Sequence, residues 1–239
     1  MGEILRNTRG TRNITLATLL LCLGIVSFQS CSSSRGVSVS TENGIVEWQL
    51  GTLNTSALSV ESKSGNPSTI DSPFGKAVLF DGKGDGLFLE RNPLVNLRQF
   101  TVEVIFRPDP NGQTEQRFLQ MGEVNGERMM LETRLTSENQ WYLDAYIKSG
   151  DSSKALIDNS KLHPAGEWCH IALVVDDGKM DTYVAGKHEL EGTVPFSPFK
   201  RGRTSIGVRM NKVYWFKGAI ARIRVTPKCL MPSEFTMSR

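Results

Sequence analysis

Short runs of alternating or continuous apolar residues, each closed by a turn, recur along most of this sequence and constrain its fold more than any other feature. The strand-like runs lie at 45–50, 77–80, 87–90, 100–107, 117–121, 129–134, 141–147, 167–175, 180–184, 205–208 and 219–225. Turn-forming Gly, Pro, Asn and Asp residues separate them, which is typical of a sandwich or barrel. The pattern predicts an all-β protein, built as a sandwich or a barrel.

Several of these runs carry further local signals. Asp176-Asp-Gly-Lys179 lies between two runs, and Asp-Gly supplies the positive φ angles of a tight hairpin over 171–184. Within 100–106, Phe and Val alternate with Thr and Glu, so we expect one face to be buried. Ser233 favours a capped helical turn at the end of the chain. We assign Trp48 and Trp168 to the core.

The N-terminal segment resembles an export signal rather than part of the fold. Arg6, Arg9 and Arg12 precede an apolar run over 14–28 that is short for a membrane span. Phe28-Gln29-Ser30-Cys31, followed by serines, is similar to a bacterial lipoprotein processing site, which implies an acylated Cys31 and a membrane anchor. The alternative is ordinary cleavage near Ser30. We therefore divide the chain into a signal peptide (1–30), a tether (31–40) and one domain (41–239).

Location and charge narrow the classes of partner. Ser32 beside Cys31 is compatible with outer-membrane sorting, so the expected location is the cell envelope, with a lipid anchor in the outer membrane. Cleavage after Ser30 leaves 239 − 30 = 209 residues, and basic residues fall from 28 to 25 while acidic ones fall from 25 to 24. The resulting formal charge of +1, without a basic stripe, argues against nucleic acid as a partner.

Two cysteines lie inside the expected domain, at Cys169 and Cys229. In an oxidising compartment they could form a disulfide or remain two separately buried thiols, and both interpretations stay open. The sequence has no CxxC motif and no Cys/His cluster, so a zinc site is not expected.

Five motifs, in the same order and at similar spacing, resemble the laminin-G-like branch of the concanavalin-A-like jelly-roll superfamily. They are Phe80-Asp-Gly-Lys-Gly-Asp85-Gly-Leu-Phe-Leu89, Phe100-Thr-Val-Glu-Val-Ile-Phe-Arg-Pro108, Trp168-Cys-His-Ile-Ala172, Tyr183-Val-Ala-Gly186 and Gly218-Ala-Ile-Ala-Arg-Ile-Arg-Val225. The resemblance covers roughly residues 40 to 235 and implies the jelly-roll fold, an antiparallel β-sandwich of two sheets. Cys169 departs from the usual His of this pattern, and Ala185 departs from the usual turn Asp.

The resemblance also implies a candidate metal site. Related domains often hold Ca²⁺ through loop carboxylates and backbone oxygens, here Asp81 and Asp85, whose neighbouring glycines let carbonyl groups approach. The alternative is that Asp81-Gly82 and Asp85-Gly86 simply form turns.

Loop aromatics next to polar residues suggest where a sugar could bind. A pyranose has an apolar face and a polar rim, so its sites pair rings with hydrogen-bonding groups. The candidates share this character: Trp141, Tyr142, Arg209, Asn211, Tyr214 and Trp215. The alternative for any single ring among them is core packing.

Catalytic constellations are not evident. Laminarinase-like enzymes of this fold carry Glu-x-Asp-x-x-Glu on one strand, and no such run occurs. Tyr214-Trp-Phe-Lys217-Gly218 is similar to a segment of jelly-roll alginate lyases, but Glu132-Thr-Arg134 matches their Arg-x-Glu-x-Arg strand poorly and their Gln-Ile-His strand is absent. We therefore expect a non-catalytic domain that binds a glycan or glycoconjugate. The alternatives are an envelope protein-binding module and a polysaccharide-active hydrolase or lyase.

Overall fold

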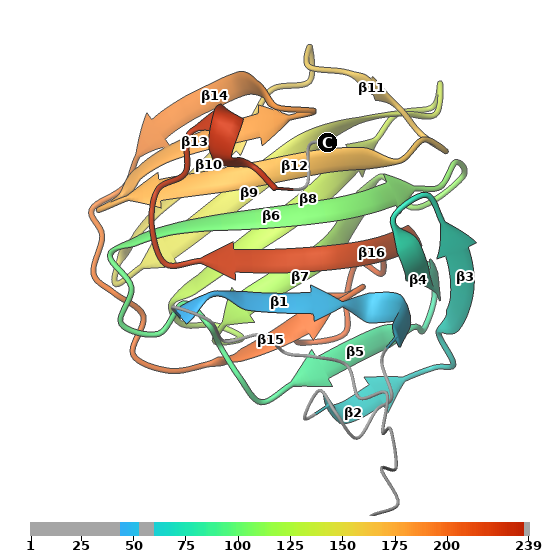
Figure 1. The fold of residues 1–239 in the computed structure, drawn as a ribbon, viewed down its shortest axis with the longest axis horizontal. Helices are drawn as coiled ribbons and strands as arrows, with labels where there is room; N and C mark the ends of the chain where they lie inside the picture. Colours follow the sequence, from blue (N-terminus) through green and yellow to red (C-terminus); the bar gives the residue numbers. More distant parts are fainter. Residues whose placement is uncertain (1–43, 53–59, 237–239) are drawn as a thin grey trace, which may run out of the picture. The chain divides into compact units, whose positions relative to one another are not determined.

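The computed structural model describes residues 44–52 and 60–236, which form two antiparallel sheets packed face to face (Figure 1). The predicted signal peptide, Cys31 and the predicted tether lie outside the described residues. The helical elements of the described part are short 3-10 turns, among them η2 (Leu50–Thr52) and η3 (Pro232–Glu234). The prediction of an all-β sandwich is confirmed.

Sheet A faces the viewer in Figure 1 and has the strand order β14-β13-β12-β6-β16-β4-β3, with β1 also paired to β16. Its strands are β1 (Val46–Gln49), β3 (Ser68–Ser72), β4 (Gly75–Asp81), β6 (Gln99–Pro108), β12 (Cys169–Asp176), β13 (Lys179–Val184), β14 (Lys187–Thr193) and β16 (Lys217–Thr226). The long central strands β6, β12 and β16 form the middle of this layer.

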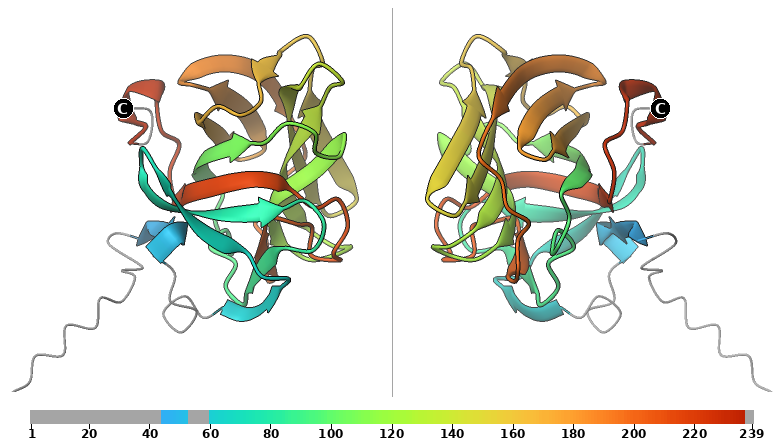
Figure 2. Two further views of the ribbon diagram at one scale, coloured as in Figure 1. Left: turned by 90° about the vertical axis from the view of Figure 1, so that its right-hand side faces the viewer. Right: turned by 90° about the vertical axis from the view of Figure 1, so that its left-hand side faces the viewer.

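Sheet B forms the second layer, which Figure 2 shows edge-on, and has the order β10-β9-β8-β7-β15-β5-β2 with β11 paired to β9. Its strands are β2 (Val60–Ser64), β5 (Gly86–Leu89), β7 (Glu115–Gly122), β8 (Arg128–Leu135), β9 (Gln140–Ser149), β10 (Ser152–Ile157), β11 (His163–Pro164) and β15 (Arg203–Ile206). All pairings in both sheets are antiparallel.

The core lies between the two sheets because alternate side chains of each strand point inward. Phe106 of β6 stacks on Phe118 of β7 with ring centroids 4.7 Å apart, and it meets Trp141 of β9 edge-on at 5.2 Å. All three rings are fully buried. They join the central strands of sheet A to those of sheet B and fix how the two layers face each other.

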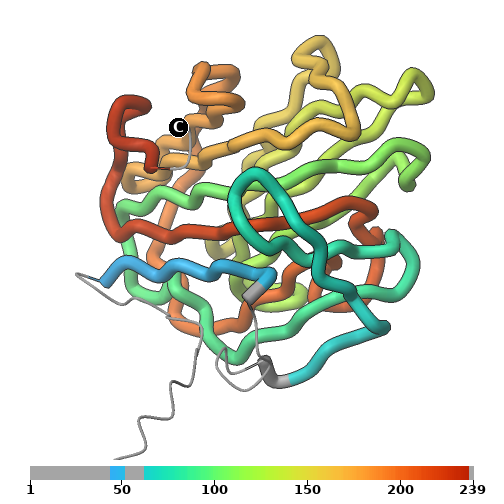
Figure 3. Tube along the Cα trace, turned by 45° about the vertical axis from the view of Figure 1, so that its right-hand side comes forward, coloured from blue at the N-terminus to red at the C-terminus, as the bar shows by residue number. Residues whose placement is uncertain are grey.

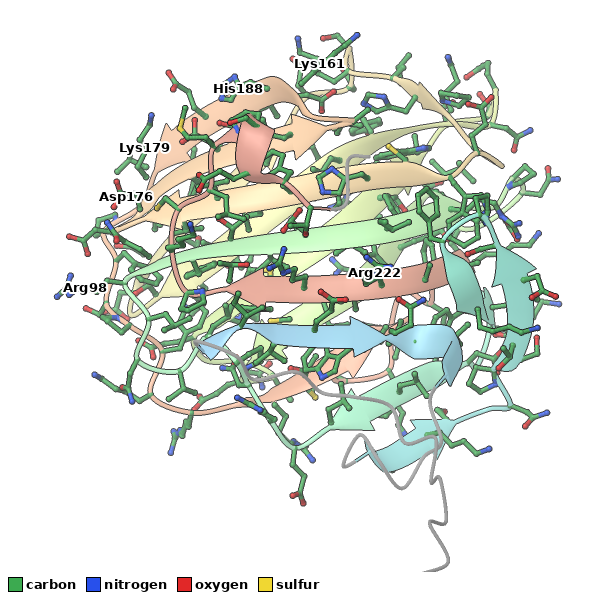
Figure 4. All side chains as sticks on the ribbon, viewed as in Figure 1. Arg98, Lys161, Asp176, Lys179, His188 and Arg222 are labelled. Carbon is green, nitrogen blue, oxygen red and sulfur yellow. The ribbon has the colours of Figure 1, made fainter. Side chains whose placement is uncertain are left out.

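Two hairpins follow the expected turn chemistry. The β12–β13 turn places Asp177 at φ 46° and Gly178 at φ 97°, so the predicted hairpin over 171–184 is confirmed. In Figure 4, Asp176 and Lys179 mark the two sides of this turn. The β13–β14 turn keeps two positive φ angles although Ala185 replaces the expected Asp, with Ala185 at 49° and Gly186 at 75°.

Each of the eleven predicted runs overlaps a strand, but the end of the chain differs from the prediction. Only the single 3-10 turn η3 forms there. Ser233 lies inside that turn, and Met231 occupies the N-cap position, so the predicted Ser cap is wrong. Figure 3 shows this C-terminal segment crossing the outer face of sheet A, where Leu230 and Phe235 pack against residues of β12.

Candidate ligand-binding face

The outer face of sheet B is largely polar because most residues of its strands alternate between the core and the outer face. On β8, Met129 and Leu131 point into the core while Glu132 and Arg134 point outward. The register places Arg117 of β7, Glu132 of β8 and Asp144 of β9 directly opposite one another. Three neighbouring strands thus carry a row of charged, largely buried groups on the outer side of the sheet.

Two arginines hold the carboxylates of this row. Arg117 donates from Nε to Glu132 Oε1 at 3.0 Å. Arg134 Nη2 donates to Asp144 Oδ2 at 2.6 Å, and Arg134 Nη1 lies 2.6 Å from Glu115 Oε1. Arg134 Nη2 also reaches Glu132 Oε2 at 3.4 Å. The arrangement is a continuous network in which each carboxylate contacts at least one guanidinium group.

Glu132 lies at the centre of this network, with 2% of its side chain exposed. Burial, which disfavours the charged carboxylate, raises its pKa to about 7, and the nearby Asp144 adds to this, while Arg117 and Arg134 act in the opposite direction. A carboxyl group that titrates near neutral pH can donate or accept a hydrogen bond at this surface. Such groups are frequent at functional sites.

Beside the network the surface is hollowed, with a volume of about 290 Å³. Arg128, Tyr146 and Ala155 contribute to its wall together with Arg209, which comes from the connection between β15 and β16. The guanidinium group of Arg128 lies over the Tyr146 ring, 5.2 Å from its centroid. The hollow therefore combines charged donors with apolar carbon.

An aromatic rim borders this face. Tyr214 is 42% exposed, and the Arg117 guanidinium lies 4.0 Å from the centroid of its ring. Trp215 is half-buried and packs on a small apolar cluster with Phe88 and Val208. Tyr214 adopts φ 60°, a conformation that non-glycine residues rarely take.

The structure brings part of the predicted sugar site together. Tyr142 lies directly opposite Arg134 in the β8–β9 register, on the outer face of sheet B, and Arg209 and Tyr214 border the same face. Asn211 is exposed in the loop before Tyr214. The structure places Trp141 elsewhere. Its side chain points into the core, has no exposed area, and donates from Nε1 to the carbonyl of Pro164 at 3.2 Å. The prediction that its ring stacks on a ligand is wrong.

Asp81 and Asp85 organise a turn. Asp81 Oδ1 accepts from the backbone N–H groups of Lys83, Gly84 and Asp85 at 2.8, 2.9 and 3.0 Å. Asp85 accepts from the backbone of Asn66 and of Asp81. Burial acts to raise the pKa of Asp81, but these backbone donors outweigh it and lower the pKa. Donors surround three of the four carboxylate oxygens, which does not fit the ligand shell of Ca²⁺.

The two domain cysteines are free thiols, so the disulfide interpretation is wrong. Cys169 begins β12, whereas Cys229 donates to the carbonyl of Val175 near the end of the same strand, at 3.3 Å. Six residues of extended strand separate these points by about 20 Å, far beyond the reach of a disulfide. Burial raises the pKa of the Cys169 thiol to about 11.

Two further clusters lie elsewhere on the sandwich. A hollow of about 290 Å³ opens between β11, β12 and β13, where His163 and Glu189 form an ion pair with 2.9 Å between Nε2 and Oε1. On the β13–β14 hairpin, Asp181, His188 and Glu191 bring their ligand atoms within 4.8 Å of one another. Lys179 lies 3.5 Å from Asp181 and 3.7 Å from Glu191, so an ammonium group already occupies this cluster.

Most of the charged face does not appear among the residues predicted from sequence motifs. Glu132-Thr-Arg134 is only a poor match to a lyase strand, and Arg117, Arg128 and Asp144 belong to no motif. The signal that could have found them is the period of two on β8, where Arg128, Met130, Glu132 and Arg134 occupy one face and mainly apolar residues occupy the other. Among the described residues no helix is long and apolar enough to cross a bilayer.

The two packed antiparallel sheets define a jelly-roll domain. The sequence profile of the concanavalin A-like lectin/glucanase superfamily matches residues 81–235, and this chain belongs to that superfamily. We found no curated protein with a matching sequence. The fold is one that both binding domains and glycoside hydrolases share.

Solved structures give the same fold at low identity. Domain 4 of AbnA, an extracellular arabinanase from Geobacillus stearothermophilus solved with arabinotriose, is 22% identical with a TM-score of 0.58, over 73% of this chain and 81% of that one. The receptor-binding domain of botulinum neurotoxin C/D mosaic serotype is 13% identical with a TM-score of 0.56, over 74% and 45%. A mutant NanB sialidase from Streptococcus pneumoniae is 16% identical with a TM-score of 0.52, over 67% and 27%.

Proposed function

We propose that this protein is a non-catalytic saccharide-binding domain whose site is the outer face of sheet B. The observation that carries this proposal is the exposed Tyr214 ring beside a hollow lined by guanidinium and carboxyl groups. Sugars present an apolar ring face together with hydroxyl groups that donate and accept. A face of this composition offers a partner for each of these features.

Membership of the lectin/glucanase superfamily supports the proposal, as does the similarity in fold to an arabinanase domain solved with arabinotriose. The charged row adds a reason of its own. Asp144 can accept from hydroxyl groups through Oδ1, while Arg117 and Arg209 can donate to ring and hydroxyl oxygens. The groups are held on three adjacent strands, so little side-chain freedom is lost on binding.

A glycan array tests the proposal, followed by titration calorimetry with the glycans that bind. We expect Tyr214→Ala to weaken binding about threefold to tenfold, because an aromatic contact contributes about 0.5–1.5 kcal/mol. The matched control is Arg222→Ala on the outer face of sheet A (Figure 4), where Arg222 donates to Gln49 Oε1. This control should bind as the wild type does.

Two other results would point to other functions. An empty array, with an envelope protein recovered by pull-down, would contradict the proposal and favour a protein-binding module. Release of oligosaccharides from a polysaccharide would indicate a hydrolase or lyase, and Glu132 is then the first residue to replace, because its pKa near 7 suits an acid or base.

We also propose that acylation of Cys31 anchors the protein to the cell envelope, on the outer membrane. The support is the sequence around Cys31 and the serines that follow it. Expression with radiolabelled palmitate should label the wild type and not Cys31→Ser. A soluble, unlabelled wild-type protein that matures in the presence of globomycin would contradict lipidation.

A further inference from the structure

The arginines on the outer face of sheet B differ in how many of their N–H donors have a hydrogen-bond partner. Arg134 contacts Glu115, Glu132 and Asp144, and each of its buried N–H groups has a partner. Arg117 contacts Glu132 through Nε, but its Nη1 is buried and has no partner. The network therefore has one end, around Arg134, whose donors are all paired, and another end with unpaired donors.

The end with unpaired donors contains two more arginines. Arg128 donates from Nη1 to the Gly126 carbonyl, and Arg209 donates from Nη2 to the Val124 carbonyl. The Nε of each is buried and has no hydrogen-bond partner among the described residues. Buried N–H groups in native proteins are nearly always paired with protein, water or a ligand. Arg117, Arg128 and Arg209 all line the same hollow of about 290 Å³.

The positive charges of Arg128 and Arg209 are not balanced by an ion pair within the described chain. Within the described chain no carboxylate lies within ion-pair distance of Arg128 or Arg209, whereas Glu115, Glu132 and Asp144 are all held by Arg134 or Arg117. Burial and the positive charges of Arg128 and Arg117 lower the pKa of Arg209, and Glu132 and Tyr146 oppose this. Three guanidinium groups line one hollow, and two of them have no carboxylate partner, which favours an anion at this end of the hollow.

The rest of the hollow indicates what the anion is attached to. Asp144 Oδ1 is buried without a donor, so it can accept from a hydroxyl group. Met130, Ala155 and the Tyr146 ring supply apolar wall. A simple inorganic anion would use neither the acceptor nor this wall. An acidic sugar would use the arginines, the Asp144 acceptor and the apolar wall.

We propose that Arg117, Arg128 and Arg209 bind the carboxylate or sulfate group of an acidic saccharide in this hollow. The inference rests on the proposed saccharide-binding function and names the class of saccharide. Guanidinium groups suit both anions because their N–H groups match the spacing of carboxylate and sulfate oxygens. Asp144 and the apolar wall formed by Met130, Ala155 and the Tyr146 ring then favour a sugar over a free anion.

Calorimetry with three galactose-based probes tests this inference: trigalacturonate, a sulfated galactan oligosaccharide and neutral galactotriose. One or both acidic probes should bind at least about tenfold more tightly than galactotriose, and the tighter of the two identifies the anion. Arg209→Ala should weaken that binding about tenfold to hundredfold, as expected for a lost charge-assisted hydrogen bond. Arg222→Ala, on the opposite sheet, should change it less than twofold.

The controls separate this inference from the proposed function. Equal binding of galactotriose and the acidic probes overturns the acidic-sugar site and leaves saccharide binding in place. Equal losses in Arg209→Ala and Arg222→Ala mean that general surface charge attracts the probes, which also overturns the site. Binding of none of the three probes overturns it too, and the glycan array then decides the proposed function. If melting shows that Arg209→Ala is unfolded, Arg128→Gln replaces it, with the same expected loss.

Discussion

Replacing Glu132 by Gln should make the stability of this protein less sensitive to pH. In the folded protein Glu132 has a pKa of about 7, against an ordinary value of 4.5, mainly because it is buried. Between these values the folded state binds more protons at this site than the unfolded state does. Its stabilising contribution is therefore complete below pH 4.5 and is lost as the pH rises to about 7.

The magnitude follows from the two pKa values. One pKa unit corresponds to about 1.4 kcal/mol, so Glu132 should cost the folded protein about 2 to 3 kcal/mol between pH 5 and pH 8. Glutamine has the shape of the protonated side chain and cannot ionise. At pH 5 the variant should match the wild type to within about 1 kcal/mol, and at pH 8 it should be more stable by about 2 to 3 kcal/mol.

Urea unfolding followed by tryptophan fluorescence at pH 5 and pH 8 measures this difference. The charged groups that face Glu132, namely Arg117, Arg134, Asp144 and Glu115, remain in both proteins. Glu138→Gln, in the exposed β8–β9 turn, is the control and should follow the wild type. If Glu132→Gln loses as much stability as the wild type between pH 5 and pH 8, the burial argument for Glu132 is refuted.

Three further predictions concern the core, a turn and the thiols. Phe106→Ala should lower the free energy of unfolding by about 3–5 kcal/mol in urea titrations, because this ring joins the two sheets. Gly207→Ala should destabilise by about 2 kcal/mol or more in the same assay: Gly207 has φ +81°, and a Cβ there would lie 2.3 Å from the Phe80 ring. Mass analysis after alkylation in denaturant without reductant should find both Cys169 and Cys229 modified; a disulfide between them would contradict the strand register.

Strands that bury one or both faces could be predicted from the sequence, and strands at the sheet edges could not. β6 and β12 alternate or run continuously apolar because the core covers them. The edge strands β3 (Ser68–Ser72) and β14 (Lys187–Thr193) are largely polar because solvent covers them, so their sequences resemble loops. Their pairing depends on the neighbouring strand, which local periodicity does not reveal.

The candidate site was predictable only in part, for a related reason. Tyr214 and Arg209 stand in a polar loop segment, where local composition marks them as candidates. Arg117, Glu132 and Asp144 are far apart in the sequence, and the register of three strands brings them together. Trp141 follows a polar loop segment in the sequence, which marks it as a loop aromatic. Residues of β9 alternate between the two faces of the sheet, however, and this alternation places the Trp141 side chain on the core face.

Amide shift mapping by NMR tests the central claim most directly, with the tightest-binding glycan from the array titrated into the isotope-labelled protein. The largest shift changes should fall on β7, β8 and β9, around Arg117, Arg128–Leu135 and Gln140–Ser149, and extend to Arg209 and Tyr214. Changes centred instead on the hollow between β11, β12 and β13, or on the outer face of sheet A, would contradict the claim that this protein binds saccharide on the outer face of sheet B.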